Sequence, residues 1–362
     1  MQIDNNRIVT LLRNVNDPES GNDLVSMKLI ENLKIQDQKV SFSVNTTGLA
    51  DVAKFKLHES ISEVILREYP EAKLDIHFVN NQGAKKPLSQ VKNIIAVASG
   101  KGGVGKSTVS VNLALGLQAL GAKVGLIDAD LYGPSIPTML NIKDEKPVIK
   151  ELYGRHRIIP IEKYGLQTIS IGNIIDPEQA VVLRGPRLGG IIKQFINEVV
   201  WPELDYLIID LPPGTGDIQL TLVQTVPITA AVIVTTPQQV AVADAIKAMN
   251  MFRLENINVP IIGIVENMSW FIPEDAQDKR YEIFGKGGGK RLAKMSQTVL
   301  LAQLPLLTSV RESGDAGKPM MLEENHYARN FYLNMAKKIL QQLAIRNDVL
   351  GPTQIVGVNI QK

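Results

Sequence analysis

The sequence predicts an α/β protein in which a doubly wound, mostly parallel sheet follows a small α+β domain. Three observations lead to this prediction. From residue 93 onward, short and nearly continuous apolar runs alternate with stretches of helical periodicity, as expected for strands that helices cover on both faces. The first run leads directly into a glycine-rich loop and a helical stretch. The pattern of apolar and polar residues also changes near residue 85, which marks a boundary between two domains.

Residues 1–85 show the pattern of the small α+β domain. Apolar residues at helical spacing precede the turn Asp17-Pro18-Glu19, and residues 39–47 then alternate apolar and polar side chains as a half-buried strand does. A second helix is expected around residues 61–66 and a second strand around 74–78. The stretch NNQGAKKPLSQ has no apolar periodicity, so we place a linker at residues 86–92.

Residues 93–345 form the predicted P-loop domain, and residues 346–362 form a tail. The runs expected to be strands are IIAVAS, KVGLIDAD, LQTISIG, DYLIIDLPP, AAVIVTTP, PIIGIVENM and TVLLAQLP. Their brevity and their Val and Ile content favour strands over segments of buried helix. A final helix is expected from about Asn325 to Leu343.

The composition excludes several classes of function. The 362 residues include no cysteine, which excludes disulfides, Cys-ligated zinc, a Cys nucleophile and an iron–sulfur cluster held by the chain's own thiolates. Lys and Arg number 39 and Asp and Glu 37, a near balance that argues against a broad nucleic-acid-binding surface. The N-terminal residues lack the apolar core of a signal peptide, and no run is long enough to span a bilayer. We therefore expect a cytoplasmic protein that binds neither membrane nor nucleic acid.

The glycine-rich loop fits the pattern G-x-x-x-x-G-K-[ST] and indicates a phosphate-binding site. Its glycines let backbone N–H groups face phosphate oxygens, and the helix N-terminus that follows adds partial positive charge. Lys106 is expected to meet the β- and γ-phosphates of ATP, and Ser107 to ligate Mg²⁺. The strand before the loop and the helix after it argue against a merely flexible turn. The predicted nucleotide-binding residues of the loop are Gly100, Lys101, Gly102, Gly103, Val104, Gly105, Lys106, Ser107 and Thr108.

Carboxylates end two of the predicted strands, Asp128 and Asp130 one of them and Asp210 another. Ligands of open α/β sheets bind beyond the carboxyl ends of the strands, so these acids should face the phosphates. Asp210 is placed to hold a metal-bound water; of Asp128 and Asp130, one would orient the metal shell and the other the attacking water. A lone strand-end acid is more often a helix cap or turn former, but three acids beside one phosphate loop favour a site.

Two further segments end strands on the same predicted edge. LPPGTGD follows Asp210 as a rigid turn that would also sense a γ-phosphate. Asn267, in IVENM, is placed either to hydrogen-bond an adenine edge or to serve as a simple turn residue, and the residues alone leave both interpretations open.

Together these motifs resemble those of the Mrp/ApbC family of P-loop ATPases, which are described as iron–sulfur cluster carriers. The matching segments, in the family's order over residues 93–340, are GKGGVGKST, DADLYGPSIP, VLRGPRLGG, LDYLIIDLPPGTGD, VENMSWF, IFGKGGG and LPLLTSVRESGDAGKP. Residues 1–85 are similar to the MIP-type domain that often precedes this ATPase domain. The second lysine of the loop, Lys101, resembles the deviant Walker A lysine of the nitrogenase iron-protein, MinD and ParA class.

The resemblance implies a Mg²⁺-dependent ATPase that acts as a homodimer, with apo iron–sulfur proteins or assembly factors as partners. It implies that Lys101 reaches the phosphates of the partner subunit and that Asp130 is the hydrolytic acid, so that the expected catalytic residues are Lys101, Lys106 and Asp130. It further implies that Asp128 and Asp210 join Ser107 in the metal shell and that Asn267 contacts adenine.

The segment after ENMSWF departs from the family pattern. Typical members carry a Cys-x-x-Cys pair there, which binds a cluster between the two subunits, whereas this chain has IPEDAQDKRYEIFGKGGG. A bound Fe–S cluster is therefore implied by resemblance alone. The alternative hypothesis is a MinD/ParA-like switch, in which ATP controls dimerisation without cluster chemistry. Its membrane form would need an amphipathic C-terminal helix, and the chain ends instead in GPTQIVGVNIQK.

Overall fold

The computed structural model describes residues 3–18, 20–36, 38–46, 49, 51–79, 88–130, 133–152, 155–174, 198–276 and 278–351. The chain divides into two compact units, the first made of residues 1–86 with 149–157 and the second of residues 87–148 with 158–362. Each unit has its own hydrophobic core. The motif VLRGPRLGG, Glu19 of the predicted turn, two residues of DADLYGPSIP and most of the predicted tail lie outside the described residues.

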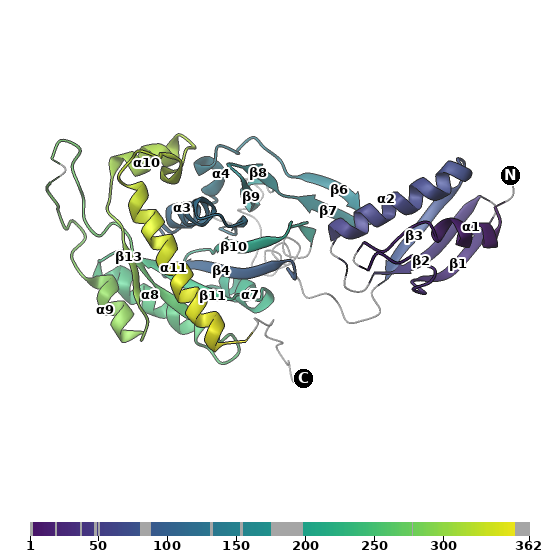
Figure 1. The fold of residues 1–362 in the computed structure, drawn as a ribbon. Helices are drawn as coiled ribbons and strands as arrows, with labels where there is room; N and C mark the ends of the chain where they lie inside the picture. Colours follow the sequence, from purple (N-terminus) through teal and green to yellow (C-terminus); the bar gives the residue numbers. More distant parts are fainter. Residues whose placement is uncertain are drawn as a thin grey trace. The chain divides into compact units, whose positions relative to one another are not determined.

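The first unit packs two helices on a three-stranded sheet (Figure 1). Its elements are α1 (Asn5–Leu12), β1 (Ile30–Gln36), β2 (Lys39–Asn45), α2 (Asp51–Glu68) and β3 (Lys73–Val79). Strand β2 lies in the middle, antiparallel to β1 and parallel to β3. Its alternating residues Val40, Phe42 and Val44 are buried, as the sequence pattern predicts.

Strand β1 was not among the predicted strands, and its geometry gives the reason. The pairing of β1 with β2 shifts register between Glu31 and Lys34, and Asn32 has a positive φ of 56°. An irregularity of this kind inserts an unpaired residue, so the apolar side chains of the strand no longer recur at every second position. The period that reveals a strand in the sequence is lost there.

The second unit is built on an eight-stranded sheet in the order β13-β12-β11-β4-β10-β5-β9-β8. Only β8, which ends the sheet at one edge, is antiparallel to its neighbour. The seven predicted runs all form strands of this sheet, so the predicted fold class is confirmed. The strands are β4 (Val91–Ser99), β5 (Val124–Asp128), β8 (Ile161–Lys163), β9 (Leu166–Ser170), β10 (Leu204–Asp210), β11 (Ala230–Thr235), β12 (Ile261–Glu266) and β13 (Leu300–Gln303). A separate pair, β6 (Val148–Leu152) and β7 (Arg155–Ile159), was not predicted.

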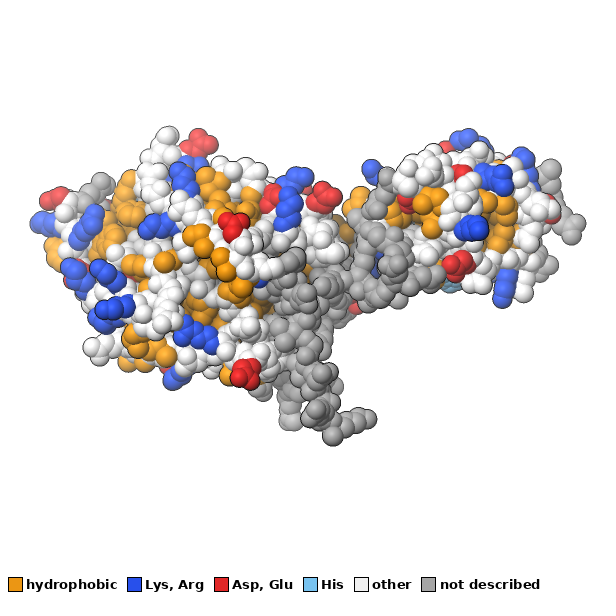
Figure 2. Space-filling view, turned by 60° about the horizontal axis from the view of Figure 1, so that its bottom comes forward, with side chains coloured by type: hydrophobic (Ala, Val, Ile, Leu, Met, Phe, Trp, Pro, Cys, Tyr) orange, Lys and Arg blue, Asp and Glu red, His pale blue; other side chains and the backbone are white. Residues whose placement is uncertain are grey.

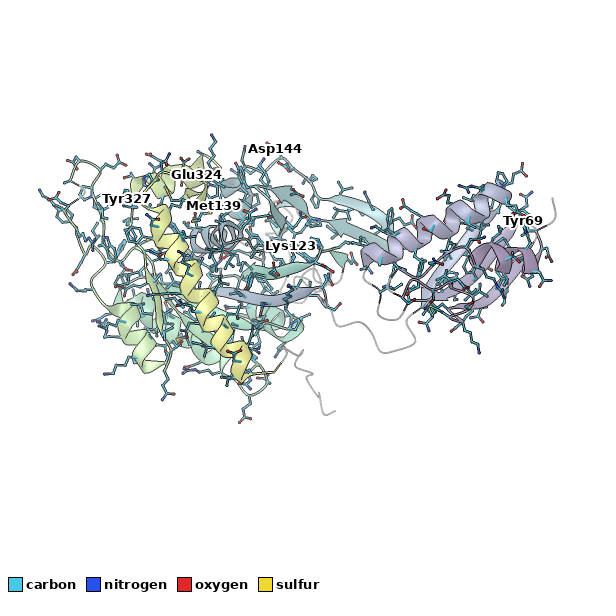
Figure 3. The ribbon with its side chains drawn as sticks, viewed as in Figure 1. Tyr69, Lys123, Met139, Asp144, Glu324 and Tyr327 are labelled. Atoms are coloured by element: carbon cyan, nitrogen blue, oxygen red, sulfur yellow. The ribbon has the colours of Figure 1, made fainter. Side chains whose placement is uncertain are left out.

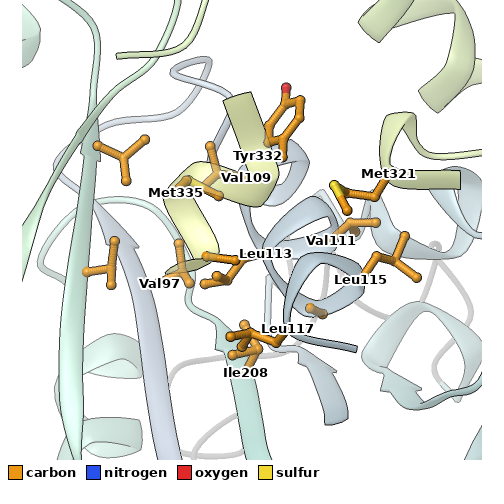
Figure 4. Packing of buried hydrophobic residues seen from close by; sticks show 14 of the residues in the cluster. Val97, Val109, Val111, Leu113, Leu115, Leu117, Ile208, Met321, Tyr332 and Met335 are labelled. Carbon is orange, nitrogen blue, oxygen red and sulfur yellow. The ribbon is translucent and has the colours of Figure 1, made fainter. Parts of the chain in front are cut away.

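Helices cover both faces of this sheet. Residues of β4 alternate between two cores: Ile95 and Val97 pack with α3 and α11, and Ala96 and Ala98 with α7, α8 and α9. Figure 4 shows Val97 and Ile208 of the sheet close to Leu113 and Leu117 of α3. The helices are α3 (Lys106–Ala119), α4 (Ile136–Met139), α7 (Asp217–Thr225), α8 (Gln239–Phe252), α9 (Gly288–Met295), α10 (Thr308–Asp315) and α11 (Arg329–Val349), with short 3₁₀ turns η1 (Ile171–Asn173) and η2 (Met320–Leu322).

The strand register places the predicted acids side by side. Asp210, the last residue of β10, pairs laterally with Asp128, the last residue of β5, and on its other side with Val97 of β4. The phosphate loop begins at Gly100, directly after Ser99, the last residue of β4. The carboxyl ends of three central strands thus meet at one edge, where ligands of open α/β sheets bind. Within the described ranges, no helix is long and apolar enough to cross a membrane.

Candidate nucleotide-binding site

The phosphate loop connects β4 to α3 in a conformation that requires glycine. Gly103 and Gly105 have φ values of 79° and 81°, in the left-handed region that glycine adopts without strain. A Cβ on Gly105 would also lie 2.2 Å from the side-chain nitrogen of Asn267, and a Cβ on Gly100 would lie 2.1 Å from the backbone carbonyl carbon of Asp244 in α8. The loop is therefore held close to two neighbouring elements.

Lys106 is the centre of a buried cluster of charges. Its Nζ atom lies 2.8 Å from Oδ2 of Asp210 and 3.7 Å from Oδ2 of Asp130. The Ser107 hydroxyl donates to the same Oδ2 atom of Asp210 at 2.6 Å. Lys106, Asp130 and Asp210 are all buried. The structure thus brings together four of the side chains that the sequence analysis assigned to phosphate and metal.

Asp128 completes the cluster from the end of the neighbouring strand β5. It accepts hydrogen bonds from the Ser170 hydroxyl at 2.9 Å and from the backbone N–H of Asp130 at 3.2 Å. Complete burial, and secondarily the negative charge of Asp210, raise the pKa of Asp128 to about 7. Two carboxylates this close are unfavourable when both are ionised, and a nearby cation would relieve that repulsion.

The second lysine of the loop, Lys101, is partly exposed and lines the same small cavity as the phosphate loop. Among the described residues its side chain forms no ion pair. Only its backbone carbonyl is used, as acceptor for the Ser99 hydroxyl at 2.9 Å. Of the two lysines in this loop, Lys101 is thus the one whose side chain forms no ion pair with an acid in the described part of the chain.

The segment after β10 lies against the start of the loop. Leu211 N–H donates to the carbonyl of Val97 at 3.0 Å, and Gly214 N–H donates to the carbonyl of Ser99 at 2.9 Å. Pro213 lines the phosphate-loop cavity. The start of the motif LPPGTGD therefore lies beside the phosphate loop and its cavity.

Two cavities adjoin at this edge. One, of about 230 Å³, is lined by the phosphate loop together with Asp130 and Pro213. The other, of about 430 Å³, is lined by Asn267, Met268 and the apolar segment Pro305–Leu307. Both are lined by Met139, labelled in Figure 3. A polar cavity beside a larger, mainly apolar one suits a molecule with a phosphate tail and a flat apolar base.

Asn267 lies between the loop and the larger cavity. It is buried, and its Nδ2 atom donates to the backbone carbonyl of Val104 at 2.9 Å. The next residue, Met268, has a positive φ of 52°, so the chain turns sharply at the cavity wall. The hydrogen bond of Asn267 thus connects the end of β12 to the phosphate loop, so this residue does more than form a turn.

Three residues of the site were not found from the sequence. Ser110 donates to Oδ1 of Asp210 at 2.6 Å, and Ser170 donates to Asp128. Glu266 is fully buried at the end of β12 and accepts hydrogen bonds from Ser269, Gln303 and the backbone of Gly289. Ser110 lies four residues after Lys106 on the same helix, which is a signal the sequence contained. Ser170 and Glu266 offered only their positions at strand ends.

The segment that lacks the expected cysteines is a closed loop. Phe271 and Tyr281 exchange backbone hydrogen bonds of 2.8 and 3.0 Å, and the Arg280 guanidinium stacks over the Trp270 ring at 4.9 Å from its centroid. Its side chains between these points offer carboxylate oxygens and cations, and no thiolate. Soft sulfur ligands hold iron in iron–sulfur clusters, so the loop does not fit a cluster.

The doubly wound sheet, the phosphate loop and the acids at its edge define a P-loop nucleotide-binding protein. Residues 90–340 match the family model described as NUBPL iron-transfer P-loop NTPase, and residues 5–73 match the model described as iron-sulfur cluster assembly protein. The chain belongs to the family of iron-transfer P-loop NTPases, which confirms the resemblance noted from its motifs.

Three similar proteins share one name. Proteins named iron-sulfur cluster carrier protein are 44% identical over 325 residues in Synechocystis sp. (88% of this chain and 91% of that protein), and 40% identical over 363 residues in Haemophilus influenzae (97% and 95%). The relative from Escherichia coli K12, of the same name, is 41% identical over 347 residues (94% and 92%).

Solved structures agree with the fold. A nucleotide-binding protein in complex with ADP from Archaeoglobus fulgidus is 35% identical, with a TM-score of 0.58 over 68% of this chain and 94% of that one. The cell division ATPase MinD from Pyrococcus furiosus has a TM-score of 0.51 over 69% of this chain and 99% of that one. At 21% identity it shows the fold alone.

Proposed function

We propose that this chain is a Mg²⁺-dependent ATPase that acts as a homodimer in the cytoplasm and serves the assembly of iron–sulfur proteins. The observation that carries the proposal is the buried cluster of Lys106, Ser107, Asp128 and Asp210 beside a phosphate loop. The names of the relatives support the link to iron–sulfur clusters.

The two adjoining cavities support ATP as the ligand. The loop residues Gly100–Thr108 would hold the phosphates through their N–H groups and through Lys106. The larger cavity would hold the adenine, with Pro305–Leu307 against its face and Asn267 at its edge. Gly102 and Gly103 have no atom within 4 Å of an added Cβ, so the space beside the loop is open to a ligand.

The oxygen donors at the strand ends fit Mg²⁺. Ser107 would ligate the ion, and Asp128 and Asp210 would hold its bound waters, since Mg²⁺ keeps several waters and prefers hard oxygen ligands. No set of three or more His, Asp or Glu side chains in the described part of the chain is arranged to hold a metal ion unaided. The ion would therefore bind together with the nucleotide, where it neutralises charge on the phosphates.

Hydrolysis requires a group that orients water and a cation for the developing charge. We assign the first role to Asp130, and its position in the wall of the phosphate cavity, with Oδ2 3.7 Å from Nζ of Lys106, supports this assignment. Lys101 is proposed for the second role in the site of the partner subunit, and its lack of an ion pair within the described residues is consistent with this. A lysine supplied in trans would resemble an arginine finger, worth on the order of 10³–10⁵ in rate.

In this proposal an iron–sulfur cluster is the cargo of the protein and not its resident cofactor. Because the chain has no thiolate, we propose that it holds no stable cluster of its own. Its part in assembly would run through thiolates of partner proteins, through small-molecule thiols or through an ATP-gated interaction with apo iron–sulfur proteins.

Lys106→Ala tests the nucleotide assignment. Removing this charge should reduce ATP affinity or turnover to near background while the circular dichroism spectrum stays unchanged. Lys143→Ala, which alters an exposed lysine, is the matched control and should retain both. ATP binding and hydrolysis at the normal level in Lys106→Ala would remove the assignment.

A further inference from the structure

One exposed surface of the second unit combines unneutralised basic side chains with exposed apolar ones. It consists of Lys290, Arg291 and Lys294 on α9 and of Tyr281 and Ile283 in the segment that leads into this helix; we call it the α9 surface. Figure 2 shows Lys and Arg side chains gathered at the end of the second unit where α9 lies, with hydrophobic side chains between them.

Within the part of the chain that the structure describes, the basic side chains of the α9 surface form no ion pair with an acid. Helix α9, GGKRLAKM, contains no acidic residue. None of Lys290, Arg291 and Lys294 forms an ion pair among the described residues, whereas the nearby Lys286 is paired with Glu282 at 2.7 Å. A charge run is commonly a solvated face, so the charges alone do not indicate a binding site.

The apolar side chains supply the second observation. Ile283 is 58% exposed, Tyr281 49% and, at the far end of α9, Met295 66%. Apolar and aromatic residues surrounded by charge are typical of a protein-binding surface, because the apolar centre loses water on contact and the charged rim orients the partner. A solvated helix face has no need of them.

We propose that the α9 surface docks an acidic face of a client protein. The inference rests on the proposed function, since it specifies the client class as acidic apo iron–sulfur proteins. Positive potential on this surface would raise the association rate and set the orientation of an acidic partner.

Two other occupants fit less well. A second copy of this chain would meet the surface through a two-fold axis, which brings the same patch to both sides and places Lys290, Arg291 and Lys294 near their own like charges. Nucleic acid presents a charged phosphate backbone, which would leave the exposed side chains of Tyr281 and Ile283 without an apolar partner. An acidic protein with an apolar centre meets neither obstacle.

The α9 surface is joined to the nucleotide-binding edge by short links. Glu266 accepts a hydrogen bond from the backbone of Gly289 at the start of α9, while Asn267, the next residue, binds the phosphate loop. On the other side of the loop, Leu306 in the wall of the larger cavity donates to the carbonyl of Trp270 at 2.7 Å. A client docked here would contact helix α9, which is hydrogen-bonded to a residue next to the nucleotide site.

The test uses the full chain and the purified apo form of an acidic plant-type [2Fe–2S] ferredoxin as probe. Lys290→Glu/Lys294→Glu reverses two charges of the α9 surface, and Lys337→Glu/Lys338→Glu makes the same change on the exposed face of α11 as the matched control. Ile283→Asp, in the segment before α9, is an independent variant in case the first does not fold. Binding is measured by calorimetry at low and at high salt, and ATP affinity is measured for every variant.

We expect the native chain to bind the probe more weakly as the salt concentration rises. The Lys290→Glu/Lys294→Glu and Ile283→Asp variants should each lose at least tenfold in affinity for the probe. The affinity of the control variant should change less than twofold. Equal loss in the control, no loss in either surface variant, or binding of duplex DNA in place of the probe would overturn the proposal, as would no binding by the native chain. Normal ATP affinity in the variants separates this result from a failure of the proposed ATPase.

Discussion

At the scale of single residues, burial limits how many charged side chains the site can hold. One lysine, Lys106, faces Asp210 and Asp130, and Asp128 lies beside them without an ion pair among the described residues. The Ser110 and Ser170 hydroxyls donate to carboxylate oxygens that the lysine does not reach, whereas Ser107 donates to the Oδ2 atom of Asp210 that the lysine also contacts. The arrangement is short of positive charge, which suits a site that receives a metal ion with its ligand.

The raised pKa of Asp128 makes stability depend on pH. With its pKa at about 7 in the folded protein and near its ordinary value when unfolded, the folded state holds a proton that the unfolded state has lost. This contribution to the free energy of unfolding is fully present at low pH and is lost as the pH rises through about 7. Because the two states differ in bound protons between the ordinary value of 3.8 and about 7, we expect the urea midpoint of the nucleotide-free protein to fall between about pH 4 and pH 7 and to level off above that range. Asp128→Asn should flatten that slope; an unchanged slope in the variant would contradict the assignment.

The Ser110 hydroxyl is expected to contribute to stability through Asp210. Ser110→Ala would leave Oδ1 of a fully buried carboxylate without its donor, and we expect the free energy of unfolding to fall by about 1–3 kcal/mol. Urea denaturation measures the change. Ser313→Ala removes a serine whose hydroxyl bonds only within its own helix, so a comparable loss in that control would show that the effect is not specific to the site.

At the scale of elements, the nucleotide edge is organised by strand ends that send neighbouring side chains to opposite faces. Glu266 and Asn267 are consecutive, and the first reaches α9 while the second reaches the phosphate loop. The glycines of GKGGGK allow this helix to begin against the sheet, since a Cβ on Gly288 would lie 2.4 Å from the carbonyl oxygen of Pro237. The buried carboxylate of Glu266 lies at the helix N-terminus, where the macrodipole stabilises negative charge.

Glu266→Gln is predicted to loosen α9. The substitution removes the negative charge from the helix N-terminus, and we expect a loss of about 1–2 kcal/mol and faster amide exchange over residues 289–293. Hydrogen exchange followed by mass spectrometry measures this directly. Glu162→Gln, an exposed carboxylate in β8, should leave exchange in α9 as it was. Equal protection of α9 in the Glu266 variant would show that the carboxylate does not hold the helix.

At the scale of the whole molecule, the decisive question is whether two chains share a site. Lys101→Ala chains keep Asp130 and Asp130→Ala chains keep Lys101, so a mixed dimer would assemble one complete site if Lys101 acts in trans. We expect each variant alone to be inactive and the mixture to recover ATPase activity. Inactive mixtures, once heterodimers are demonstrated by native mass spectrometry, would count against the shared site.

The absence of cysteine leads to a prediction for the assembled protein as well. After anaerobic reconstitution with iron and sulfide and desalting without added thiol, the chain should retain neither iron nor sulfide, while still binding Mg-ATP. A control chain in which Pro273 and Ala276 of the loop are replaced by cysteine should retain more iron. Near-stoichiometric iron and sulfide with a cluster absorbance band in the native chain would show the prediction to be wrong.

The sequence by itself determined the features that depend on neighbours along the chain. Seven buried strands and the phosphate loop were predicted because apolar runs and the spacing of Gly, Lys and Ser are local properties. The tertiary structure alone decided which distant residues contact the ends of those strands. Ser170 donates a hydrogen bond to Asp128, which is 42 residues away in the sequence, and Ser110 donates one to Asp210, which is 100 residues away. It also decided that Glu266 is a buried helix cap and that β1 is a strand with broken register. Pairing between strands and packing of helices on the sheet create these contacts, and no period along the chain records them.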